Sequence, residues 1–285
     1  MRVVVWALVL AALLVSVAWL VRQAEARLAF FPSRGEDVTP AAAGIAFEAL
    51  DVATSDGERL RAWWLPRADA AASVLYLHGN GGNLSMWLPI LADVWQQGYA
   101  VFAIDYRGYG ASSGAPSESG LYRDVEAALG AFRTRAEGGG APVVYWGRSL
   151  GAVMAAYAAR QDAPSGVVLE AGFPHLRSVL SGSPLWLLSF FSSYAFPAAR
   201  WMRDVRAPTL VIHGDRDSVI PYRLGRRLYE ELPGPKEFFT VPGGDHNDLR
   251  PAAPEAYWRV VRDFISRLPP AQAAARNEDT RCSSA

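Results

Sequence analysis

The sequence has little cysteine, little lysine and no net charge, and each shortage excludes a class of protein. Of the 285 residues one is cysteine, Cys282, so no disulfide and no cysteine-based metal site can form within the chain. Lysine occurs once, at Lys236, and 28 basic side chains cancel 28 acidic ones. The arginines are scattered among acids rather than clustered, so nucleic acid is not expected as a partner.

Apolar residues, by contrast, are abundant. They make up 51% of the chain while charged residues make up 20%, which is enough to bury a sizeable core and excludes a disordered protein. No repeat of fixed period is present, and the glycine-rich loops match neither the phosphate-binding nor the dinucleotide-binding pattern. We therefore expect a globular, nucleotide-independent domain.

The N-terminus predicts a membrane anchor. Residues 3–21 are apolar except for Ser16, and as a helix they extend roughly 28 Å, close to the hydrocarbon thickness of a bilayer. The alternative is a cleaved signal peptide, for which Ala24-Glu25-Ala26 supplies a small-x-small site. The run is longer than a usual signal core and Arg22 follows it directly, so an uncleaved, single-pass anchor is favoured. Arginines flank both ends of the run, so the side of the membrane that holds the main domain stays open.

Behind the anchor the pattern predicts a linker (22–44), a main domain (45–268) and a disordered tail (269–285). Within the domain, 45–52 and 60–65 read as a hairpin, and six further short apolar runs alternate with helical segments. This alternation predicts a mostly parallel sheet with helices on both faces. The predicted strands are 74–77, 100–104, 143–146, 167–169, 209–212 and 237–241, and the predicted helices are 84–97, 120–135, 150–160, 223–232 and 254–268.

One long insertion interrupts the alternation. Residues 173–204 are rich in aromatic side chains that the sheet does not need, which predicts a lid over a site. We expect Trp186, Phe190 and Phe191 to bind substrate there. The alternative is an extra structural helix pair.

A nucleophile is predicted where a strand passes into a helix. Gly147-Arg148-Ser149-Leu150-Gly151 fits G-x-S-x-G, with a strand before it and a helix of small residues after it. Such an elbow exposes Ser149 above the carboxyl edge of the sheet. The backbone N–H of Leu150 and that of Asn80, in the loop after the first parallel strand, are the expected oxyanion donors.

A base and an orienting acid must complete the site. Of four histidines, His246 lies in the loop after the last strand, where an imidazole can reach the elbow, whereas His78 and His213 end strands and His175 lies in the insertion. Asp215 and Asp217 both follow the predicted strand 209–212, so position alone does not show which of them orients His246.

These motifs resemble those of the α/β-hydrolases, and more narrowly the membrane-anchored hydrolase-domain proteins and the serine aminopeptidase and monoacylglycerol-lipase-like group. The similarity extends over about residues 45–268. It rests on the elbow and on four further segments, 77–83, 105–110, 118–124 and 213–221. The resemblance implies the α/β-hydrolase fold, with Asp217 as the third member of a triad with Ser149 and His246. It also implies that residues 105–108 have a structural role. At Asp245, directly before His246, the sequence departs from the family's pattern, in which a small residue is more usual.

The function implied is hydrolysis of a carboxylic ester or thioester with an apolar acyl group, such as a lipid, without a metal or organic cofactor. The alternatives are a peptidase or amidase of the same fold, and a non-catalytic binding protein that keeps the pocket.

Overall fold

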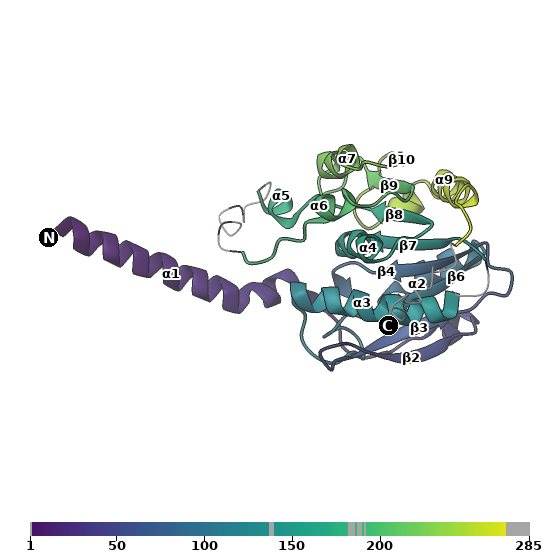
Figure 1. The fold of residues 1–285 in the computed structure, drawn as a ribbon, viewed down its shortest axis with the longest axis horizontal. Helices are drawn as coiled ribbons and strands as arrows, with labels where there is room; N and C mark the ends of the chain where they lie inside the picture. The colour runs from purple at the N-terminus through teal and green to yellow at the C-terminus, as the bar shows by residue number, and fades with distance from the viewer. Residues whose placement is uncertain (1, 137–139, 182–185, 187–189, 191, 272–285) are drawn as a thin grey trace, which may run out of the picture.

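The computed structural model describes residues 2–136, 140–181, 186, 190 and 192–271. One long helix, α1 (Arg2–Ala29), projects from a body in which helices lie on both faces of a twisted sheet (Figure 1). The α/β-hydrolase fold expected from the sequence is confirmed.

The main sheet has eight strands in the order β10-β9-β8-β7-β4-β6-β3-β2. From β6 to β10 every neighbouring pair is parallel, whereas β2 and β3 form the predicted antiparallel hairpin at one edge. The strands are β2 (Glu48–Ala53), β3 (Arg59–Leu65), β4 (Ala72–Leu77), β6 (Tyr99–Ile104), β7 (Val143–Arg148), β8 (Gly166–Glu170), β9 (Thr209–Gly214) and β10 (Lys236–Val241). A short pair, β1 (Phe31–Pro32) and β5 (Gly81–Gly82), lies outside this sheet.

Helices cover both faces because the central strands are apolar on both. Every residue of β4, β6 and β9 is buried, as expected for parallel strands between two helical layers. One core packs α3, α4, α6 and α7 against the sheet, and the other packs α2 and α9. The helices and the one 3-10 turn are η1 (Pro40–Ala43), α2 (Leu84–Gln96), α3 (Glu118–Ala136), α4 (Leu150–Gln161), α5 (Leu176–Leu180), α6 (Ala198–Met202), α7 (Tyr222–Glu230), α8 (Leu249–Ala252) and α9 (Pro254–Ser266).

The segment behind the apolar run contacts the main domain at several points. Helix α1 continues to Ala29, and Phe30 is buried at 3% exposure against Tyr194 and Phe196. Phe31–Pro32 then pairs with the loop after β4. Within 22–44, the buried ring of Phe30 and the β1 pairing thus attach this segment to the domain.

Among the described residues, one helix is long and apolar enough to cross a membrane. It is Arg2–Arg22, with a mean hydropathy of 2.7 and no part of the apolar window buried. A signal sequence meets the same criterion, so length and composition leave both predictions standing. Most of the predicted tail, from residue 272 onward, lies outside the described residues.

Candidate active site

Ser149 stands at the turn from β7 into α4, in a backbone conformation that is rare for a residue with a side chain. Its φ is 56° and its ψ −117°, and its N–H donates to the carbonyl of Glu170 at 2.8 Å. The flanking glycines allow this turn sterically. A Cβ on Gly147 would lie 1.8 Å from the carbonyl oxygen of Gly151, and one on Gly151 would lie 1.9 Å from that of Leu77. The strained elbow therefore holds the serine hydroxyl in a fixed position.

His246 and Asp217 complete a chain of hydrogen bonds to that hydroxyl. The Nε2 atom of His246 lies 3.1 Å from the Oγ of Ser149, and its Nδ1 lies 2.8 Å from the Oδ2 of Asp217. The other carboxylate oxygen of Asp217 accepts the N–H groups of Val219 and Ile220 at 2.9 and 2.7 Å. The geometry is that of an orienting acid, a base and a nucleophile.

Asp217 is held as a carboxylate. Burial alone raises the pKa of its carboxyl, but hydrogen bonds from His213 and His246, the electrostatic attraction between the carboxylate and His246, and the Ile220 N–H outweigh burial and lower that pKa well below its ordinary value. An ionised Asp217 accepts a hydrogen bond from the Nδ1–H group of His246, which keeps the proton on Nδ1 and leaves Nε2 free to accept from Ser149.

Two further acids, Asp215 and Asp245, lie near the hydrogen-bonded triad and have other contacts. Asp215 accepts the N–H of Gly243 at 2.7 Å and braces the turn between the loops after β9 and β10. Asp245 accepts the N–H and hydroxyl of Ser218 at 2.7 and 2.8 Å and the N–H of His246 at 2.7 Å, which ties the acid loop to the base loop. Hydrogen bonds from the Ser218 and His246 N–H groups lower the pKa of Asp245.

The other three histidines have structural contacts. His78 is buried, with Nδ1 2.7 Å from the carbonyl of Gly79, and Nε2 of His213 lies 2.8 Å from the carbonyl of Ile220. His175 caps α5 by accepting the N–H of Ser178 at 3.1 Å. Within the described residues His246 is the histidine whose ring contacts a serine hydroxyl at the sheet edge.

The expected oxyanion donors, Asn80 and Leu150, both line the cavity above Ser149. Among the described residues, no protein acceptor is bonded to either backbone N–H. Asn80 is fixed from two sides, since its carbonyl accepts the hydroxyl of Tyr109 at 2.9 Å and its side-chain amide donates to the carbonyl of Ala29 at 2.6 Å. The second of these bonds joins the loop to α1, which the sequence did not suggest.

Sequence reasoning missed Arg148, the residue directly before the nucleophile. Its side chain is 4% exposed, donates to the carbonyl of His246, lies 3.7 Å from the carboxylate of Glu170 and covers the ring of Trp87 at 5.5 Å. It anchors the base loop to the strands beneath. The signal was present, because an arginine at the end of a fully apolar strand needs a buried partner.

A cavity of about 800 Å³ opens above Ser149. Its wall from the insertion consists of Phe173, Leu176, Val179, Leu180, Ser192, Tyr194 and Phe196, and α1 contributes Val21, Glu25 and Ala29. The cavity is predominantly apolar, as expected for an acyl-binding site.

Two of the three aromatic residues predicted to bind substrate are described by the structure, and neither is in this wall. Trp186 and Phe190 are 49% and 61% exposed and are not among the residues that line the cavity, so their part in substrate binding stays a prediction. Their rings pack on each other with centroids 6.0 Å apart, and the guanidinium of Arg177 lies over Phe190 at 5.1 Å. Phe191 lies outside the described residues, as do 182–185 and 187–189 of the predicted lid.

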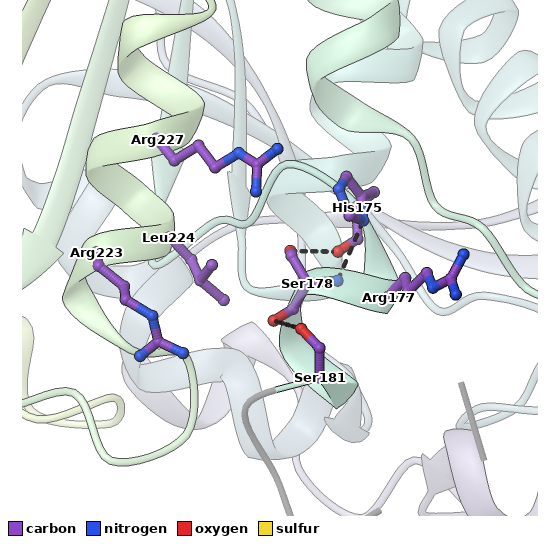
Figure 2. Close-up of a pocket in the computed structure, with 7 residues that line it drawn as sticks. All are labelled: His175, Arg177, Ser178, Ser181, Arg223, Leu224 and Arg227. Carbon is purple, nitrogen blue, oxygen red and sulfur yellow. Dashed lines mark hydrogen bonds between the residues drawn. The ribbon is translucent and has the colours of Figure 1, made fainter. Parts of the chain in front are cut away.

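A second, smaller cavity of about 350 Å³ lies between α5 and α7 (Figure 2). Arg223 and Arg227 extend from α7, and His175 and Ser178 line the facing side. This serine and histidine form a helix cap instead of a nucleophile and base, since the Ser178 hydroxyl donates to the His175 carbonyl at 2.6 Å. Burial and the nearby charge of Arg227 lower the pKa of His175.

Comparison with known proteins assigns the family. A sequence model of the alpha/beta hydrolase fold matches residues 72–203. An uncharacterized protein of Mycobacterium tuberculosis is 36% identical over 248 residues, which is 85% of this chain and 86% of that protein. The chain belongs to the α/β-hydrolase superfamily. The stretch matched by the model contains Ser149 but ends before Asp217 and His246.

Two more comparisons place this α/β hydrolase among relatives. An uncharacterized membrane protein of Saccharomyces cerevisiae is 32% identical over 247 residues, 80% of this chain and 82% of that protein. The solved structure of a Pyrococcus furiosus esterase has a TM-score of 0.70 at 18% identity, covering 84% of this chain and 98% of that one. At this identity the likeness shows a shared fold.

Proposed function

We propose that this α/β hydrolase is a serine hydrolase that cleaves ester or thioester bonds of an apolar acyl substrate through an acyl-enzyme. The observation that carries the proposal is the continuous chain Asp217–His246–Ser149, with separations of 2.8 and 3.1 Å. A serine hydroxyl alone is a weak nucleophile, and a base within hydrogen-bond reach that is itself oriented by a carboxylate is what activates it.

The chemistry follows from the proton positions. As Ser149 Oγ bonds to the acyl carbon, its proton passes to Nε2 of His246, and Asp217 stabilises the resulting imidazolium. The N–H groups of Leu150 and Asn80 donate to the oxyanion, each worth about 3–4 kcal/mol of barrier by analogy with a protease donor. The alcohol or thiol leaves with the proton from His246. A water molecule deprotonated by His246 then releases the acid and restores Ser149.

The apolar wall of the cavity supports an apolar acyl group. A volume of about 800 Å³ lies in the upper part of the range of small-molecule sites, and the wall offers aliphatic and aromatic side chains for an alkyl chain. The helix Arg2–Arg22 supports attachment to a membrane, where such substrates are concentrated.

Covalent labelling by a fluorophosphonate tests the proposal. Ser149→Ala is expected to abolish labelling in a protein that melts cooperatively near the wild-type temperature. Ser178→Ala, which changes the serine of the other serine–histidine contact, should label normally. A folded wild-type protein that does not label contradicts the hydrolase proposal and favours a binding protein.

A substrate panel then tests the bond that is cleaved. p-Nitrophenyl esters of increasing acyl length, acyl-thioesters and aminoacyl anilides should be compared by kcat/KM. We expect esters or thioesters with medium or long acyl chains to be cleaved fastest. Faster cleavage of the anilides would replace the esterase proposal with an amidase or peptidase.

Membrane attachment is tested separately. We expect the chain to keep its N-terminal apolar residues and to stay in the membrane fraction after carbonate washing. A soluble mature chain that begins near Arg27 would establish the signal-peptide alternative.

A further inference from the structure

The last two turns of α1 form part of the cavity above Ser149. Val21, Glu25 and Ala29 all line it, and their spacing of four residues places them on one face of the helix. At 1.5 Å per residue this face extends about 12 Å along the helix axis. The helix that carries the apolar span is therefore also a wall of the candidate active site.

The facing wall is α5 together with residues 192–194, and Glu25 joins the two. Its carboxylate accepts the hydroxyl of Ser192, the N–H of Ser193 at 3.0 Å and the N–H of Tyr194 at 3.3 Å, while its side chain is buried. Burial on its own raises the pKa of Glu25, but these hydrogen bonds outweigh burial and lower it. An ionised Glu25 thus fixes α1 to the end of the insertion.

The cavity wall on α1 begins where the apolar span of that helix ends. The apolar span ends at Arg22, and Val21, one residue before, already lines the cavity. Three apolar side chains that also line it, Phe31, Met86 and Val219, are more than half exposed. Such exposed apolar side chains around a cavity mouth are costly in water and stable against lipid. With α1 as the proposed anchor, the cavity opens where the span would leave the membrane.

We propose that the acyl chain enters the cavity directly from the bilayer that holds α1, passing along the face of Val21, Glu25 and Ala29. The substrate class is then a membrane-resident acyl lipid or lipid-modified molecule, and Val21 and Ala29 determine how long an acyl chain fits. This inference rests on the proposed function and names the source of its substrate.

The test of the access route uses full-length protein in phosphatidylcholine vesicles and a long-chain fluorogenic ester that stays in the bilayer. When protein and ester share one vesicle, hydrolysis should be at least tenfold faster than when they occupy separate vesicles mixed at the same concentrations. A water-soluble acetate ester should show no such difference. Equal rates for the long-chain ester in the two arrangements would overturn the proposal.

A matched pair of substitutions tests the wall. Val21→Trp fills the cavity from α1 and is expected to lower the ratio of long-chain to acetate hydrolysis at least fivefold. Leu20→Trp adds the same side chain one residue earlier, where the native side chain is exposed and does not line the cavity, and should change that ratio less than twofold. A similar change in both variants, or in neither, would contradict the inference.

The outcomes separate the two proposals. Wild-type protein that cleaves the acetate ester and labels with fluorophosphonate, yet shows no preference for its own vesicle, overturns bilayer access and leaves the hydrolase intact. Protein that neither labels nor cleaves either ester overturns both.

Discussion

Replacing Asp217 by asparagine tests whether this acid orients His246. The amide keeps one oxygen, which can still accept the Val219 and Ile220 N–H groups, but it presents NH₂ where Oδ2 now receives Nδ1 of His246. The ring then holds its proton on Nε2, and that atom can no longer accept from Ser149. The folded shape is preserved while the base is lost.

The expected loss in kcat is about four orders of magnitude, the size seen for the same change in a well-studied serine protease. Four orders of magnitude correspond to about 5.4 kcal/mol of activation free energy. Stability should fall by much less, about 1–3 kcal/mol, since a charge-assisted bond becomes a neutral one. The assay is ester hydrolysis in parallel with thermal unfolding.

Asp215→Asn is the matched control. Its contact is the N–H of Gly243, and an asparagine oxygen accepts that bond equally well, so kcat should stay within about threefold. An inactive, well-folded Asp215→Asn together with an active Asp217→Asn would refute the assignment.

Two further predictions concern stability. Gly151→Ala should lower the free energy of unfolding by at least about 2 kcal/mol, because the new Cβ would lie 1.9 Å from the Leu77 carbonyl oxygen. Gly130→Ala, where the space around the new Cβ inside α3 is open, should raise it by about 0.5–1 kcal/mol. Urea unfolding measures both changes. Because the pKa of Asp217 is lower in the folded chain than its ordinary 3.8, its contribution to stability is present above that value and declines as the pH falls below it. The fall in melting temperature between pH 5 and pH 3 should therefore be smaller in Asp217→Asn, and an unchanged slope would count against the low pKa.

The sheet and the elbow were predictable because they depend on local pattern. Parallel strands buried on both faces appear as short apolar runs, and a nucleophile elbow needs glycines at fixed positions on both sides of Ser149. The structure also brings His246 to the serine, as expected from its place after the last strand. These features depend on short local patterns and on the order of elements along the chain, so they can be recognised without knowing the packing.

The wall of the cavity was not predictable in the same way, since it depends on which apolar side chains happen to face inward. The insertion has six aromatic residues between 186 and 201, but their number does not show which of them face the cavity. Trp201 packs against Tyr157 and Tyr122 and supports α4, whereas Trp186 and Phe190 lie on the outside. Short helices such as α5 take their orientation from contacts distant in sequence, so hydrophobic content alone does not show which side chains of the insertion line the cavity.

The sequence did not suggest that α1 lines the cavity, because the apolar span and the domain were interpreted as separate units. A run of 19 residues with a single polar member, Ser16, has the length and composition of an anchor, and these properties contain no information about a second contact. The contact depends on three positions four residues apart, Val21, Glu25 and Ala29, of which Glu25 is a buried acid near the end of the helix. An acid there is costly unless it is bonded, and its bonds run to residues 192–194, about 170 positions away. If α1 is both anchor and cavity wall, removing it should change acyl-chain selectivity as well as location, whereas a simple tether would affect location alone.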